Sequence, residues 1–313
     1  MQFRTEISLK KAGRQIAYPD NIALLGSCFA ENIGKLLKDN KFNVDVNPFG
    51  VLYNPLSIEN ALRILLEKRL FSEKNLFLHN GVWNSFAHHG SFSNISLNDT
   101  LQNINNKVIT SSEKLFKTDF LLITFGTAWV YEKDNKVVAN CHKLPEKEFQ
   151  RRHLEVSEIV DCYTKLMADI QKINPDLRII FTVSPIRHWK DGAHENQLSK
   201  STLLLSINEL QNRFENIDYF PAYEIVLDEL RDYRFYEEDM LHPNLLSINY
   251  IWEKFSEIYF SAETQHIQKE ISQIAKAEAH RPFNPQTAEY QSFLKDLELK
   301  KTNILRKYPF LSK

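Results

Sequence analysis

One serine lies where its hydroxyl group could act as a nucleophile. The segment Gly26-Ser27-Cys28-Phe29-Ala30 follows a short apolar run and precedes a segment of helical periodicity. This placement predicts that Ser27 lies in a tight turn at the carboxyl edge of a sheet. There, the N–H groups that begin the following helix can stabilise a developing oxyanion. The alternative is that Ser27 only caps this helix, which is a common role of serine.

The residues that could activate this serine lie far downstream. The segment Glu238-Asp239-Met240-Leu241-His242-Pro243-Asn244 places an aspartate and a histidine three positions apart, before a segment rich in aromatic residues. On one turn, the Asp239 carboxylate can orient the His242 ring while its other nitrogen accepts a hydroxyl proton. Taken alone, such a pair is usually a cap or a surface ion pair. Together with Ser27, it predicts a Ser-Asp-His catalytic triad.

A scaffold that brings these distant segments together follows from the hydrophobic pattern. Short apolar runs alternate with longer segments of helical periodicity, which is typical of a parallel sheet with helices on both faces. We expect strands at Ile22–Leu25, Phe42–Val46, Phe120–Thr124, Ile179–Val183 and Ile217–Phe220, and helices at Glu31–Lys38, Ile58–Lys68, Leu101–Leu115, Ser157–Ile173 (with Ser157 as N-cap) and Gln197–Phe214. The predicted fold class is α/β, with a doubly wound, mostly parallel five-stranded sheet whose ligands bind outside the carboxyl ends of the strands.

Two segments depart from this alternation, and the end of the chain is helical. Phe77–Phe92 and Val130–Ala139 are predicted hairpin insertions, because Asn80-Gly81 and Asp134-Asn135 are turn residues. Residues 281–285 interrupt the helical pattern before a last helix from about Thr287 to Arg306. We expect an α/β catalytic domain over residues 1–264 and a helical C-terminal extension over residues 265–313. This extension packs either on the core or on a second copy of the chain, which would make a homo-oligomer.

Composition excludes several classes of protein. The 313 residues are 43% hydrophobic, enough for a large core, and 39 basic residues nearly balance 40 acidic ones. The chain therefore lacks the excess positive charge that attracts nucleic acid electrostatically. No run approaches the roughly 20 apolar residues of a membrane span. The beginning of the sequence lacks a signal-peptide pattern and the three cysteines form no disulfide framework, so we expect a cytoplasmic protein. No metal-binding motif is present, and we predict neither a metal nor a cofactor.

The two motifs also carry a family resemblance. The pentapeptide Gly26–Ala30 resembles the signature of the GSCFA family, which is similar to the SGNH/GDSL esterase superfamily. Asp239-Met240-Leu241-His242-Pro243 resembles the last motif of that superfamily, and the resemblance spans roughly residues 21–260. It implies an SGNH- or flavodoxin-like three-layer fold, with Ser27 as nucleophile, His242 as general base and Asp239 as the orienting acid.

The resemblance further implies an oxyanion hole, and here the sequence departs from the superfamily pattern. Gly50 matches the glycine donor after the second strand, and the backbone around Ser27 and Cys28 supplies further N–H groups. The third strand, however, runs into Gly126-Thr127-Ala128-Trp129, with an alanine where the superfamily has a donor asparagine. Losing such a donor typically costs about 10²–10³ in rate. The candidates to replace it are the Thr127 hydroxyl, the Trp129 indole N–H and the Asn196 amide.

A cationic loop follows the fourth strand and is a candidate for binding substrate. In Ser184–Gly192, the side chains of Arg187, His188 and Lys190 could together bind a carboxylate or phosphate. The alternative is an internal ion pair of Arg187 with Asp191 or Glu195. Trp129 and the adjacent histidines His88 and His89 are further candidates for lining the cleft, although half-exposed loop histidines are usually without such a role.

These observations leave three functions open. The first is a serine-dependent acyl-ester hydrolase, for example a carbohydrate O-deacetylase, acting through a covalent acyl-enzyme on a small ester such as an acylated carbohydrate or an anionic substrate. The second is an O-acyltransferase that uses the same residues. The third is a non-catalytic ligand-binding protein, which the missing asparagine favours. A nucleophilic Cys28, with its pKa lowered at the helix N-terminus, is a further alternative on the same scaffold. A small buried thiol that packs beneath the turn is the more common role of such a cysteine.

Overall fold

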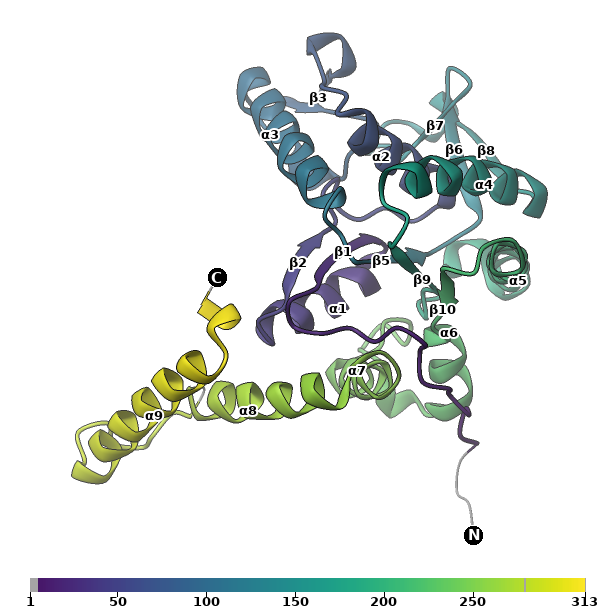
Figure 1. The fold of residues 1–313 in the computed structure, drawn as a ribbon. Helices are drawn as coiled ribbons and strands as arrows, with labels where there is room; N and C mark the ends of the chain where they lie inside the picture. The colour runs from purple at the N-terminus through teal and green to yellow at the C-terminus, as the bar shows by residue number, and fades with distance from the viewer. Residues whose placement is uncertain (1–4, 279, 313) are drawn as a thin grey trace.

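A five-stranded parallel sheet forms the centre of the computed structural model, which describes residues 5–278 and 280–312 (Figure 1). Its strands are β1 (Asn21–Gly26), β2 (Asn43–Val46), β5 (Phe120–Phe125), β9 (Arg178–Val183) and β10 (Ile217–Tyr219). They lie in the order β10-β9-β5-β1-β2, and each neighbouring pair is parallel. The chain winds from β1 to β2 on one side and then from β5 to β10 on the other. The predicted doubly wound α/β fold is therefore confirmed.

Alternating residues of each central strand pack on opposite faces of this sheet. In β5, Leu121 and Ile123 join one hydrophobic cluster, whereas Phe120 and Leu122 join the other. The first cluster is covered by α2 (Pro55–Glu67), α3 (Leu97–Leu115), α4 (Val156–Ile173) and α5 (Gly192–Arg213), and the second by α1 (Cys28–Asp39) and α7 (Leu245–Tyr259). Burial on both faces explains why β1, β5 and β9 are continuous apolar runs in the sequence.

The predicted helices are all present, but most begin earlier than the apolar periodicity indicates. The first turn of α5 begins at Gly192 instead of Gln197, and α1 begins at Cys28, directly after its cap Ser27. The prediction of Ser157 as the N-cap of α4 is wrong. The cap position is Glu155, which lies two residues before Ser157 and makes no capping hydrogen bond through its side chain within the described ranges.

Both predicted hairpin insertions are confirmed. The strands β3 (Phe77–His79) and β4 (Val82–Asn84) pair across Asn80 and Gly81, which have φ values of 49° and 76°. The strands β6 (Trp129–Lys133) and β7 (Lys136–Val138) pair across Asp134 and Asn135, which also have positive φ. A two-residue type I′ turn requires positive φ at both central residues, and its twist matches that of the strands it joins. A third strand, β8 (Gln150–His153), pairs with β6 and was not predicted from the sequence.

The end of the chain forms the predicted helices. Helix α7 is followed by α8 (Ala262–Glu278) and α9 (Ala288–Lys307), with Thr287 as the N-cap of α9, and Figure 1 shows α8 and α9 extending away from the sheet. The aromatic ring of Phe310 returns to stack on Tyr18. The shorter helices are α6 (Ala222–Glu224), η1 (Glu73–Asn75), η2 (Gly90–Phe92), η3 (Glu146–Glu148), η4 (Trp189–Asp191), η5 (Ile225–Glu229), η6 (Tyr233–Phe235) and η7 (Pro309–Ser312). Within the described ranges, every helix is too short or too polar to cross a membrane.

Candidate active site

The turn that carries Ser27 is built by a glycine. Gly26 ends β1 with a φ of +144°, and a Cβ atom at this position would lie 2.3 Å from the carbonyl oxygen of Thr124 on β5. The close approach of the two strands thus requires glycine. Ser27 then caps α1, because its Oγ accepts the N–H of Phe29 at 3.3 Å. The predicted capping role is therefore present. The Ser27 hydroxyl lies at the end of β1, next to β5, where the winding direction of the sheet changes.

The aspartate and histidine of the second motif form a hydrogen-bonded pair. Oδ2 of Asp239 lies 2.5 Å from Nδ1 of His242, while Oδ1 accepts the N–H groups of Leu241 and His242 at 2.9 Å each. These backbone donors, followed by the His242 ring, lower the pKa of Asp239 to about 2. The ionised carboxylate can only accept, so Nδ1 of His242 carries the proton and Nε2 is left as a base.

Both motifs line one cavity at the carboxyl ends of β1, β5 and β9. It has a volume of about 500 Å³, and Ser27, Cys28, Thr127, Arg187 and His242 are among its lining residues. The Ser27 hydroxyl and the His242 ring do not form a hydrogen bond to each other in the described part of the chain. The structure thus brings the predicted nucleophile and base to the same cavity.

The four predicted oxyanion donors differ in what their N–H groups bind. Those of Ser27, Gly50 and Thr127 donate to the carbonyl oxygens of Thr124 (3.3 Å), Asn47 (2.7 Å) and Tyr53 (3.0 Å), respectively. Gly50 moreover does not line the cavity, because the chain there turns against His89. The N–H of Cys28, in the first turn of α1, has no oxygen acceptor among the described residues. This group is therefore the one predicted backbone donor left available to a substrate oxygen.

The three predicted replacements for the missing asparagine are also differently placed. The Thr127 hydroxyl lies in the cavity wall but is bound to Ser199 Oγ at 3.1 Å and to the N–H of Trp129 at 3.1 Å. Trp129 lines the cavity, yet its indole nitrogen is buried and has no partner among the described residues. Asn196 does not line the cavity, and its Oδ1 accepts the N–H of His188 at 2.9 Å. Asn196 therefore positions the cationic loop.

The cationic loop lies along the cavity. Arg187, His188 and Lys190 all line it. The predicted alternative, a pair of Arg187 with Asp191 or Glu195, is wrong for Asp191, because Arg151 binds that carboxylate. Among the residues that the structure describes, no carboxylate pairs with Arg187, whose guanidinium carbon lies 5.0 Å from the centre of the Trp189 ring. Burial, followed by the nearby Lys200, lowers the pKa of His188 to about 4, so this ring is neutral at pH 7.

His88 and His89 lie away from this cavity. His88 is 1% exposed, stacks on Phe49 with ring centres 4.6 Å apart, and bonds through Nδ1 to Ser85 Oγ at 2.9 Å. His89 instead caps η2 by accepting the N–H of Ser91. The half-exposed position predicted as the alternative is found for His89, but it is wrong for His88. The position of neither ring supports the predicted contact with substrate.

Two residues beneath or beside the cavity were missed by sequence reasoning. Lys200 is 0% exposed and donates through Nζ to the carbonyl oxygens of Gly126 (2.7 Å) and Ser184 (2.8 Å), which follow β5 and β9. Burial lowers the pKa of this ammonium group to about 7. Asn54 caps α2 at the cavity wall. Its position after the second strand was the available signal, whereas nothing in the sequence around Lys200 distinguishes it from a surface lysine.

The predicted low pKa of Cys28 is wrong. Burial raises the pKa of its thiol, and this effect outweighs the N–H groups at the start of α1. A thiol with a raised pKa is mostly protonated at neutral pH and is a poor nucleophile. The structure therefore favours Ser27 over its neighbour.

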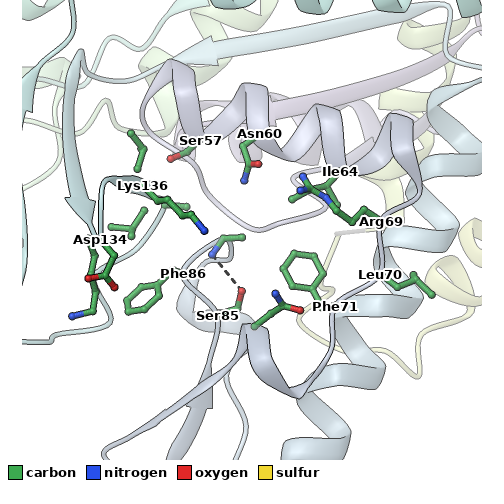
Figure 2. Close-up of a pocket in the computed structure, with 16 residues that line it drawn as sticks. Ser57, Asn60, Ile64, Arg69, Leu70, Phe71, Ser85, Phe86, Asp134 and Lys136 are labelled. Atoms are coloured by element: carbon green, nitrogen blue, oxygen red, sulfur yellow. Dashed lines mark hydrogen bonds between the residues drawn. The ribbon is translucent and has the colours of Figure 1, made fainter.

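A second cavity, of about 350 Å³, lies between α2 and the two hairpins (Figure 2). Ser57 and Asn60 of α2 line one side of it, and Ser85 and Phe86 line the other. Ser85 Oγ accepts the N–H of Ala87 at 3.3 Å and is bound to the buried His88 ring. No aspartate or glutamate in the described part of the chain binds His88, so this cavity lacks an oriented base.

Comparison with known families identifies the class of protein. The model of the GSCFA family matches residues 21–255, and a model described as the GSCFA domain protein, C-terminal domain, matches residues 271–312. This chain therefore belongs to the GSCFA family, and the resemblance drawn from Gly26–Ala30 is confirmed. The matched region includes Ser27, Asp239 and His242. A search of curated protein sequences found no significant match.

Several solved structures are similar to this chain at low identity. A family two carbohydrate esterase from Clostridium thermocellum, in complex with cellohexaose, is 11% identical over 82% of this chain and 66% of its own, with a TM-score of 0.38. A carbohydrate esterase family 3 protein from Talaromyces cellulolyticus is 13% identical over 82% of this chain and 98% of its own, with a TM-score of 0.35. An acetyl xylan esterase from Butyrivibrio proteoclasticus is 10% identical over 82% and 66%, with a TM-score of 0.38.

Proposed function

We propose that the protein is a serine-dependent hydrolase of acyl esters in which Ser27, His242 and Asp239 form a catalytic triad. One observation carries this proposal: Ser27, at the N-terminus of α1, and His242, held by Asp239, line the same cavity. The cavity lies at the point where the sheet changes winding direction, which is where doubly wound sheets bind ligands. The three residues occur in the chain order that the family resemblance implies.

The arrangement provides for both halves of an acyl transfer. Nε2 of His242 accepts the proton of the Ser27 hydroxyl as Oγ attacks the ester carbonyl, and Asp239 stabilises the imidazolium that forms. His242 then returns the proton to the departing alkoxide, which leaves an acyl group on Ser27. Water, deprotonated by the same histidine, releases the acid in the second half. Each step uses groups that line the cavity or bind one that does.

The charges around the cavity favour an anionic substrate. Arg187 lines the cavity with no carboxylate partner in the described ranges, and Lys190 lies beside it, bound to Tyr131 and Glu146. Asp191 is an acidic residue of the cavity wall, and Arg151 forms an ion pair with it. A guanidinium group binds carboxylate or phosphate through two parallel hydrogen bonds. We therefore propose that Arg187 binds a carboxylate or phosphate of the substrate next to the ester.

Turnover of short-chain aryl esters by the purified protein tests the proposed function. We expect hydrolysis that depends on Ser27 and persists in the presence of a chelator, because the triad supplies both the nucleophile and the base. Ser27→Ala is the inactive variant for comparison. Turnover that disappears with chelator and returns with a divalent cation would overturn the triad mechanism. A folded protein that binds anions but turns over no ester would support the alternative of a non-catalytic binding protein.

A further inference from the structure

The site lacks a side-chain donor at the position where the family resemblance implies one. Ala128 occupies it and is 0% exposed, and its N–H donates to Ser199 Oγ at 2.7 Å. This residue therefore offers nothing to a substrate oxygen. An oxyanion hole with the Cys28 N–H alone would have a single donor, whereas acyl transfer generally uses two or more.

The segment that leads into α2 lies next to Ser27 and to the turn that contains Ala128. The N–H of Leu52 donates to the carbonyl oxygen of Gly26 at 2.9 Å, next to Ser27. The N–H groups of Gly126 and Thr127 both donate to the carbonyl oxygen of Tyr53, at 2.7 and 3.0 Å. Residues 52–54 are thus held between the end of β1 and the end of β5. Gly126 permits this approach, because a Cβ atom there would lie 2.9 Å from the Tyr53 oxygen.

The residue that follows, Asn54, presents an amide group to the cavity. It is 6% exposed and lines the cavity together with Ser27 and Cys28. Its Oδ1 accepts the N–H of Ser57 at 2.8 Å as the N-cap of α2. Since an N–H requires an acceptor, this bond fixes which atom is the oxygen and leaves Nδ2 on the other side. In the described part of the chain, Nδ2 of Asn54 has no acceptor.

We propose that Asn54 is the oxyanion donor that takes the place of the missing asparagine. As Ser27 Oγ forms its bond to the carbonyl carbon, the π electrons of the carbonyl move to its oxygen, which becomes negatively charged. The Nδ2–H of Asn54 and the N–H of Cys28 donate hydrogen bonds to this oxygen, and they release it when the carbonyl reforms and the alkoxide departs. The capping bond to Ser57 holds the amide in place beforehand, so no reorganisation is needed during the reaction. This inference rests on the proposed hydrolase function.

Substitutions that separate capping from donation test the inference. Asn54→Ser keeps an oxygen that caps α2 but removes the amide donor, and serine caps about as well as asparagine. We expect kcat for a short-chain ester to fall about 10²–10³-fold with little change in KM, as for other oxyanion donors. Asn54→Asp also preserves the cap, replaces the donor with a negative charge, and should lose at least as much activity. Ser96→Ala is the matched control, because it removes the cap of α3 (Ser96 Oγ accepts the N–H of Asp99) away from the cavity.

The outcomes distinguish this inference from the function on which it rests. Wild-type protein that hydrolyses the ester, Asn54→Ser and Asn54→Asp proteins that are slow but melt near the wild-type temperature, and an active Ser96→Ala protein support the inference. An Asn54→Ser protein with wild-type kcat overturns it while the hydrolase function stands. Wild-type protein that neither turns over esters nor reacts with a fluorophosphonate overturns the proposed function and this inference with it.

Discussion

Two serine–histidine constellations in this molecule differ in what surrounds them. Ser85 and His88 form a direct hydrogen bond of 2.9 Å beside the smaller cavity, whereas Ser27 and His242 share the larger cavity without one. Proximity alone would select the first pair. His88, however, is buried among aromatic rings, and burial, followed by the nearby His142, lowers its pKa to about 3. A base that weak accepts a proton poorly at neutral pH.

The second constellation has the parts that the first lacks. His242 is bound to an ionised carboxylate, its side chain is 49% exposed, and its Nε2 is left as an acceptor. Ser27 lies at the N-terminus of a twelve-residue helix, whose positive end and available Cys28 N–H can stabilise negative charge. Under the proposed function, an oriented base and an anion-stabilising position indicate the site better than a short serine–histidine distance.

The largest expected effect comes from removing one member of the Ser27 site. Ser27→Ala and His242→Ala should each reduce turnover of a short-chain ester by about 10⁴–10⁶, and the double variant should be little worse, because the residues act as a unit. Ser85→Ala, which removes the buried hydroxyl of the other constellation, should retain turnover within a few-fold. Steady-state kinetics on proteins with matching circular dichroism spectra make the comparison. Comparable losses for Ser27→Ala and Ser85→Ala would remove the distinction between the two regions.

A smaller effect is expected from removing Arg187, which lines the larger cavity. Arg187→Ala should lower kcat/KM for an ester that carries a carboxylate or phosphate by about 10–100-fold, the value of a charged hydrogen bond. A neutral ester should be affected less than about three-fold, since it offers the guanidinium no partner. Arg69→Ala, in the wall of the smaller cavity, is the control. Equal losses on both substrates would make Arg187 structural or catalytic instead of substrate-binding.

The buried Lys200 should give the stability of the protein a particular pH dependence. Burial lowers the pKa of this group to about 7 in the folded protein, compared with about 10.4 in an unfolded chain. Between these values the unfolded chain binds the extra proton, so the contribution of Lys200 to the free energy of unfolding becomes more favourable as pH rises. Urea unfolding at pH 7 to 10 should therefore show a wild-type minus Lys200→Met difference that increases with pH. Parallel curves would show that the ammonium keeps its ordinary pKa.

The smallest effect on activity is expected at Cys28. Its thiol lines the cavity but has a raised pKa, so Cys28→Ala should keep turnover within a few-fold. Loss of the partly buried side chain should cost at most about 1–3 kcal/mol of unfolding free energy. Cys141→Ala, which also removes a thiol from the cavity wall, is the matched control. An inactive Cys28→Ala protein beside an active Ser27→Ala protein would make this a cysteine enzyme.

The sequence was sufficient for the sheet and for the parts of the site that lie within local motifs. All five strands of the sheet were predicted, most clearly β1, β5 and β9, which are apolar runs buried on both faces, whereas the edge strands β2 and β10 are shorter and partly exposed. The Asp239–His242 pair follows from spacing on one turn. Helix starts were less accurate, because the first turn of α5 is polar and carries no apolar periodicity. Strand β8 was missed because Gln150–His153 contains no apolar residue, and only its pairing with β6 makes it a strand.

The remaining parts of the site depend on contacts between distant segments, which spacing does not encode. Arg151 pairs with Asp191 across 40 positions of sequence, and this carboxylate is therefore not bound to Arg187, which has no acidic partner among the described residues. Lys200 is buried only because the carbonyl oxygens after β5 and β9 converge on its ammonium group. Asn54 was likewise overlooked, since the reason for its position is the pairing of Tyr53 with Gly126 and Thr127. Tertiary packing, not residue type, determines the surroundings of Arg187, Lys200 and Asn54.

Covalent labelling with a fluorophosphonate tests the central claim most directly, because only an activated serine attacks phosphorus at a useful rate. After reaction with the folded protein, peptide mapping by mass spectrometry locates the modified side chain. The account predicts a single phosphonylated residue, Ser27, with labelling abolished in Ser27→Ala and greatly slowed in His242→Ala. Modification at Ser85 instead, or no modification of well-folded wild-type protein, would contradict it.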